Sequence, residues 1–208
     1  MRDMDLSPLI VVAVIAIIGA AIFHLVSEGQ KRQALWAKLA EQLGLKHEGS
    51  VLLGEYLGLS VRIGVETRRN PDGYGQFCVV RAEVPGTLPV GFVAAPRRWT
   101  TGLDRMLAEN TFEASDPALR ECYILQSDVP QEGQALIARP EVQKALLELY
   151  SPKRVGFVEK KRVHVAYAGL VEDVEELRMA LKDVVQTALT LGEAHAHLNP
   201  GPESQPTS

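Results

Sequence analysis

The sequence predicts an α+β protein in which an N-terminal transmembrane helix precedes an antiparallel sheet of about seven strands packed against helices. Three observations carry this prediction. Residues 8–26 are continuously apolar, residues 59–66 alternate apolar and polar side chains, and residues 170–191 repeat apolar side chains at helical spacing. The 208 residues therefore divide into a transmembrane anchor (1–27), a soluble α+β domain (28–198) and a disordered tail (199–208).

The anchor is the strongest signal. Residues 8–26 read PLIVVAVIAIIGAAIFHLV, and as a helix they would span about 28 Å, close to the hydrocarbon thickness of a bilayer. A cleaved signal peptide is the alternative, but the leader sets Arg2 against two aspartates and so lacks a positive n-region. Because Lys31, Arg32 and Lys38 follow the span closely, the basic bias predicts a single-pass cell-membrane protein whose C-terminal domain is cytoplasmic.

A helix and a hairpin follow the anchor. Leucines recur every four residues from Leu35 to Leu43, and Gly44 is placed to end the helix that they predict. Residues 51–57 and 59–66 predict a hairpin, and the second of its strands has one apolar and one polar face.

The next segment predicts a turn, two strands and a short helix. Residues 69–73 have the composition of a turn, and the strand expected at 76–84 places Cys78 among the core side chains. Residues 89–96 predict a short strand at a sheet edge, because prolines bound it. A short helix is expected near 103–109.

The second half begins with a strand at 119–126 and a helix at 140–149, whose Pro140 suits a first turn. Residues 155–158 and 163–167 predict a second hairpin. In its second strand, His164 falls on the face opposite the apolar side chains, which we expect to be exposed to water.

The last helix, at 170–191, is the clearest. Its apolar spacing would also permit a coiled-coil homodimer through Leu177, Leu181 and Val184. The apolar stripe is broader than a coiled-coil seam, however, and this breadth favours a long helix laid across the sheet.

Composition excludes several classes of protein. The formal net charge of -4 argues against nucleic-acid binding, and two cysteines are too few for a disulfide scaffold or a structural zinc site. No cofactor fingerprint or nucleophile motif is present. His195 and His197 are two apart near a helix end, where they would not share a face, so we interpret them as solvated rather than metal-binding.

Basic clusters are the remaining candidates for a site. They fall at predicted loops or hairpin ends, where they could simply be solvated or could contact the anionic inner leaflet of the membrane. The candidate membrane-surface residues are Arg97, Arg98, Trp99, Lys160, Lys161 and Arg162.

A set of short motifs extends over about two thirds of the chain. In order, they are Leu53-Gly54-Glu55-Tyr56-Leu57-Gly58, Asp116-Pro117-Ala118-Leu119, Tyr123, Ser127-Asp128, residues 140–149 and the final hairpin. In this pattern the chain resembles bacterial single-span membrane-anchored proteins of an uncharacterised family. The resemblance implies a cell-membrane location and supplies no catalytic residues.

We therefore expect a membrane-anchored cytoplasmic protein that is a non-enzymatic module, with the bilayer at residues 8–26 and a protein or the membrane surface as its partners. The alternative is an enzyme or small-ligand-binding protein with a pocket between the sheet and the long helix. No cofactor is expected.

Overall fold

The computed structural model describes residues 33–70, 73–99 and 109–199. Within these ranges one antiparallel sheet of nine strands has the order β1-β2-β3-β4-β9-β8-β5-β7-β6, which confirms the α+β class with more strands than predicted. The strands are β1 (Lys46–Glu48), β2 (Val51–Tyr56), β3 (Leu59–Asn70), β4 (Gly73–Glu83), β5 (Val93–Pro96), β6 (Thr111–Phe112), β7 (Tyr123–Gln126), β8 (Arg154–Glu159) and β9 (Arg162–Ala168).

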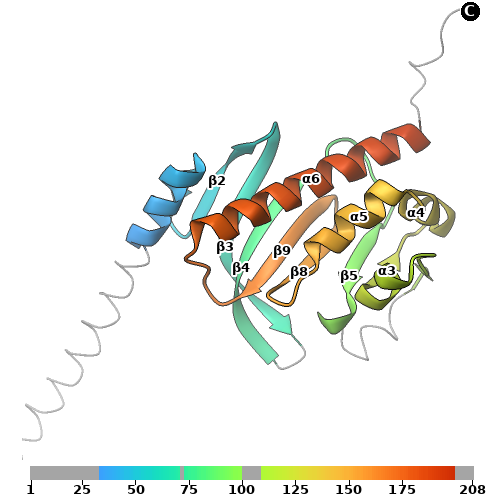
Figure 1. Cartoon of the computed structure of the whole chain (residues 1–208), viewed down its shortest axis with the longest axis horizontal. Helices are drawn as coiled ribbons and strands as arrows, with labels where there is room; N and C mark the ends of the chain where they lie inside the picture. Colours follow the sequence, from blue (N-terminus) through green and yellow to red (C-terminus); the bar gives the residue numbers. More distant parts are fainter. Residues whose placement is uncertain (1–32, 71–72, 100–108, 200–208) are drawn as a thin grey trace, which may run out of the picture.

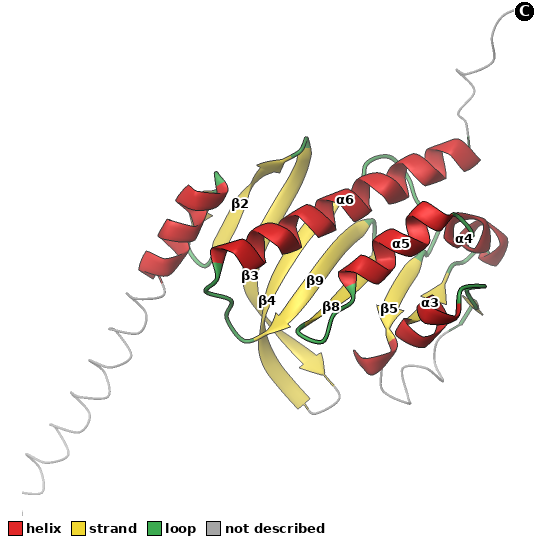
Figure 2. Cartoon of the chain, viewed as in Figure 1, coloured by secondary structure: helices red, strands yellow, loops and turns green. Residues whose placement is uncertain are grey.

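The helices cover one face of this sheet, with α6 lying across the strands and α5 beside it (Figures 1 and 2). Residues 33–43 are helical, and Gly44 ends this helix with a φ of 67°. The others are η1 (Arg97–Trp99), α3 (Pro117–Cys122), α4 (Pro130–Ile137), α5 (Pro140–Leu149) and α6 (Val174–Leu198).

The long helix α6 begins at Asp173, whose side chain accepts hydrogen bonds from the backbone N–H groups of Glu175 and Glu176. Its stripe of Leu177, Leu181 and Val184 is fully buried in the main hydrophobic core. The prediction that this stripe packs on the sheet is confirmed, and the same side chains are therefore covered by the chain itself rather than free for a coiled coil.

The strand predicted at 119–126 is wrong in its first half. Asp116 accepts a hydrogen bond from the backbone N–H of Leu119 at 3.0 Å, and Pro117 occupies the first turn of the helix that follows. Helix α3 therefore occupies Pro117–Cys122, and only Tyr123–Gln126 forms a strand.

The short strand β5 also differs from the expectation, because it lies inside the sheet between β8 and β7 rather than at an edge. Its prolines do not prevent this position. Pro89 precedes the strand, where its carbonyl accepts from Phe92, and Pro96 is the last residue of the strand.

Within the described ranges, no helix is both long and apolar enough to cross a bilayer. The predicted anchor at 8–26 lies outside these ranges, as do most of the helix expected at 103–109 and the tail beyond Asn199.

Candidate functional site

The two faces of the sheet differ in what covers them. From β4, Cys78, Val80 and Ala82 point into the core shared with the helices, as the alternation predicted for Cys78. Phe77 and Val79 point the opposite way and belong to a second, smaller cluster that contains no α-helical residue. We call this second side of strands β2, β3, β4, β9 and β8 the helix-free face, since no α-helix of the described residues packs on it.

One end of the helix-free face is apolar. The ring of Trp99 makes edge-to-face contacts with Phe77 and Phe157, with centroid distances of 4.7 Å and 5.4 Å. Beneath them lie Val155 and Ala166, both buried. Trp99 is therefore packed in an aromatic cluster and remains partly exposed.

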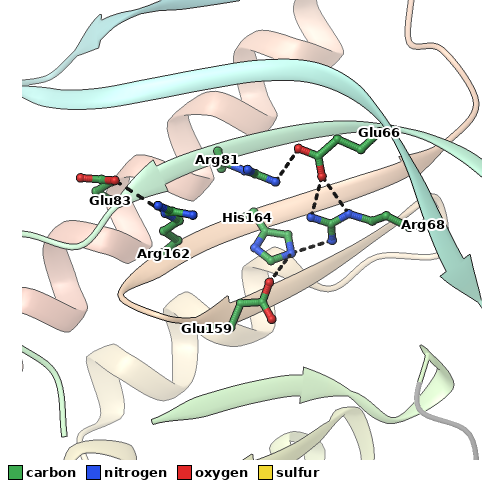
Figure 3. Close-up of polar contacts among 7 residues, drawn as sticks. All are labelled: Glu66, Arg68, Arg81, Glu83, Glu159, Arg162 and His164. Carbon is green, nitrogen blue, oxygen red and sulfur yellow. Dashed lines mark hydrogen bonds and ion pairs between the residues drawn. The ribbon is translucent and has the colours of Figure 1, made fainter. Parts of the chain in front are cut away.

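The middle of the face carries a network centred on Glu66 (Figure 3). One carboxylate oxygen accepts from Nε and Nη2 of Arg68 at 3.2 and 3.1 Å, and the other accepts from Nη2 of Arg81 at 2.6 Å. Both ion pairs are partly buried, with side-chain exposures between 18% and 30%. One carboxylate thus holds two guanidinium groups from neighbouring strands.

His164 lies next to this network and is buried, with 2% exposure. The alternation in the sequence predicted the correct face for His164, but the predicted contact with water is wrong. Phe157 covers the imidazole by stacking on it at a centroid distance of 4.8 Å. Nη1 of Arg68 donates to Nε2 of His164 at 2.8 Å. Since an arginine can only donate, Nε2 is unprotonated and the ring proton lies on Nδ1.

The surroundings of His164 keep the imidazole neutral. Burial lowers its pKa well below the ordinary value of 6.5, and the positive charges of Arg68, Arg81 and Arg162 lower it further. A carboxylate oxygen of Glu159 lies 3.9 Å from Nε2, beyond hydrogen-bond distance.

Strand register places the key side chains in one row across the helix-free face. Leu53 is opposite Arg62, Arg62 is opposite Arg81, Arg81 is opposite His164, and His164 is opposite Phe157. Two positive side chains are therefore direct neighbours on adjacent strands. The side chain of Arg62 is exposed and forms no hydrogen bond or ion pair with any described residue.

A hollow of about 230 Å³ lies over the part of this row formed by Leu53, Arg62 and Arg81. Its polar lining comes from Ser60 and Arg62 on β3, Arg81 and Glu83 on β4, and Arg162 on β9. In Figure 3, Arg162 extends toward Glu83, and the two side chains form an exposed ion pair with a distance of 3.6 Å.

The six candidate membrane-surface residues lie in two groups at opposite ends of β8. Lys160 and Lys161 form the exposed turn after β8, and Arg162 begins β9 at the rim of the hollow. Arg98 lies at the other end of β8, where its Nη2 donates to the carbonyl of Arg154 at 2.6 Å. The structure therefore does not combine the two groups into one basic patch.

The arginines of η1 are engaged within the fold. Nε of Arg97 donates to the carbonyl of Arg120 at 2.6 Å. The guanidinium of Arg98 also donates to the carbonyl of Ser151 and lies 4.6 Å from the ring centroid of Tyr150. These contacts tie η1 to neighbouring loops.

A second hollow, of about 400 Å³, borders the first turns of α6. Arg154 lines it and pairs with Asp183 while also donating to the carbonyl of Glu148 at 2.9 Å. Burial opposes the charge of Arg154, but its hydrogen bonds to Asp183 and Tyr167 outweigh burial and raise its pKa.

The histidines near the C-terminus differ from the expectation of a solvated pair. His195 is buried, with its ring nitrogens 3.2 Å from the hydroxyl of Thr87 and 3.1 Å from the side-chain nitrogen of Asn199. His197 is exposed. The described residues contain no group of three or more potential metal ligands.

A scan against protein-family models and searches of curated proteins and of solved structures found no match for the chain. The resemblance to bacterial single-span proteins therefore stays a prediction.

Proposed function

We propose that the protein is a membrane-anchored, non-enzymatic docking module of the cytoplasmic face, and that the helix-free face is its docking surface. The observation that supports this function is the exposed turn Lys160-Lys161 beside Arg162 and Arg62. Arg62 and Arg162 line the hollow, and Lys160 and Lys161 form the turn that leads directly into Arg162.

The predicted anchor would hold the whole domain close to an anionic leaflet. Residue 33, the first described, follows the end of the predicted span by seven positions, so the chain keeps it within about 25 Å of that end. Each basic residue near an anionic leaflet contributes about 1 kcal/mol of attraction. The tether would therefore turn a weak surface attraction into stable docking, because it raises the effective concentration of the domain at the membrane surface.

The alternative of an enzyme or ligand-binding pocket between sheet and long helix has less support. The helix stripe of α6 is fully buried, and the hollow beside its first turns is bordered by Arg154, whose charge is already paired with Asp183. Arg62 and Arg162, which are more exposed than Arg154, lie on the helix-free face, on the other side of the sheet from α6.

The full chain in lipid nanodiscs tests the proposal. We expect amide hydrogen exchange across residues 157–163 to be slower in nanodiscs that contain phosphatidylglycerol than in nanodiscs of phosphatidylcholine alone. High salt should remove the difference, because exposed charges are screened.

The paired substitution Lys160→Glu with Lys161→Glu should abolish this protection. Its matched control is Lys144→Glu with Lys182→Glu, which makes the same change of charge on exposed positions of α5 and α6. Equal exchange in both lipids, or equal loss in both double variants, would argue against docking through the helix-free face.

A further inference from the structure

The hollow on the helix-free face is lined by three guanidinium groups that retain most of their hydrogen-bond donors. Arg81 uses one nitrogen, in its bond to Glu66. Arg162 lies 3.6 Å from Glu83, beyond hydrogen-bond distance, and Arg62 has no partner among the described residues. A guanidinium carries five N–H donors, so the hollow offers many donors and few acceptors.

Strand pairing places two of these positively charged groups next to each other, where they repel. Arg62 and Arg81 are direct cross-strand neighbours, and like charges in this arrangement destabilise a sheet. Partial burial of Arg81 is the largest cause of its lowered pKa, and the charges of Arg68 and Arg62 lower it further against the opposing effect of Glu66. An anion between the two guanidinium groups would remove this repulsion.

The charge and shape of the lining indicate which anion fits. The three arginines of the lining together with Arg68, which shares Glu66 with Arg81, outnumber the carboxylates Glu83 and Glu66 by two charges. A phosphate monoester carries close to two negative charges at neutral pH, whereas a single carboxylate carries one. The lining also has the hydroxyl of Ser60, which can donate, and the apolar side chain of Leu53.

We infer that the hollow between Arg62, Arg81 and Arg162 binds the phosphate of a phosphate monoester, with the carbon skeleton of the ester against Leu53. This inference deepens the proposed function, on which it rests for its use of the same face. The phosphate could be carried by a soluble ester or by a lipid headgroup of the phosphatidic acid type, since both present the same dianion.

Calorimetric titration of the full chain in detergent micelles with phenyl phosphate tests the inference. We expect binding, and we expect benzoate to bind at least about tenfold more weakly because it carries one charge. Arg62→Gln should weaken phenyl phosphate binding about tenfold. Because the Arg62 side chain is exposed, has no partner among the described residues and repels Arg81, this variant should not lower the melting temperature of the chain.

Arg69→Gln is the matched control. It removes one exposed arginine from the same strand at a position outside the hollow, so binding should change by no more than about twofold. Absence of phenyl phosphate binding, equal binding of benzoate, or equal effects of the two variants would overturn the inference.

Nanodiscs distinguish the two sources of the phosphate. If phosphatidic acid in the nanodisc abolishes phenyl phosphate binding while phosphatidylglycerol does not, the lipid headgroup occupies the hollow. Unchanged binding in both nanodiscs assigns the hollow to a soluble ester. Because the titration in micelles requires no docking, failure of the docking proposal leaves this result interpretable by itself.

Discussion

Arg68 on β3 donates a hydrogen bond to His164 on β9 across the intervening strand β4, although 96 positions separate the two residues in the sequence. The guanidinium also lies 5.8 Å from the ring centroid of Phe157, which itself stacks on His164. One arginine therefore holds together the polar and aromatic parts of the helix-free face.

Removal of this arginine should be costly. Arg68→Ala takes away the hydrogen bond to His164 and one of the two cations on Glu66, and we expect the free energy of unfolding to fall by about 1–3 kcal/mol. Denaturant unfolding measures the loss. Arg68→Lys keeps the charge but not the fork of donors, so an intermediate loss is expected. Equal stability of all three proteins would show that the contact contributes nothing.

The neutral state of His164 makes stability depend on pH. The unfolded chain takes up a proton on this residue near pH 6.5, but the lowered pKa prevents the folded protein from doing so until the pH is much lower. The unfolded state therefore gains protons first, and the free energy of unfolding, highest above about pH 6.5, should decrease as the pH falls below it. Unfolding curves for the unmodified chain and His164→Gln should show a shallower decrease in the variant. Parallel decreases would contradict a buried neutral imidazole.

Close packing of α5 on β8 depends on a glycine. A β-carbon at Gly156 would lie 2.4 Å from Cβ of Leu149 and 3.1 Å from the hydroxyl of Tyr123. We expect Gly156→Ala to destabilise the protein by about 1–3 kcal/mol, measured by thermal unfolding. Gly64→Ala is the control within a strand, because its nearest atom would be at 3.4 Å, and its melting temperature should not fall. A similar loss in both variants would remove the packing argument.

The predicted topology can be tested by fusing reporters after Ser208. A reporter that is active only in the cytoplasm should be active, and one that is active only outside should not, because the basic residues follow the predicted span. The opposite result would reverse the orientation and remove the inner leaflet as a docking target.

Local patterns in the sequence predict which face a side chain takes but not which strands become neighbours. Alternation correctly assigned Cys78 to the core, and Arg81, three positions further along the same strand, lies on the opposite face. Nothing local indicates that Arg81 lies between Arg62 and His164, because that neighbourhood depends on the pairing of β4 with β3 and with β9. The candidate site therefore appeared in the sequence only as separate polar positions.

The errors in the fold have both local and non-local origins. The strands β1 and β6 have three and two residues, too few for a periodic pattern. Helix α4 lacks a side-chain cap at Val129, so the sequence gives little indication of where this helix begins. The burial of His164 was missed because Arg68 and Phe157, which cover it, come from distant strands.

The turn between β8 and β9 has two lysines in the left-handed region, with φ values of 49° at Lys160 and 61° at Lys161. Such two-residue turns favour Asn-Gly, and each residue with a side chain in this conformation costs roughly 1–2 kcal/mol. The double substitution Lys160→Asn with Lys161→Gly should thus raise the melting temperature of the protein. It would also remove two cations from the proposed docking surface. At this hairpin, selection for a more stable domain and selection for a positively charged surface would favour different residues.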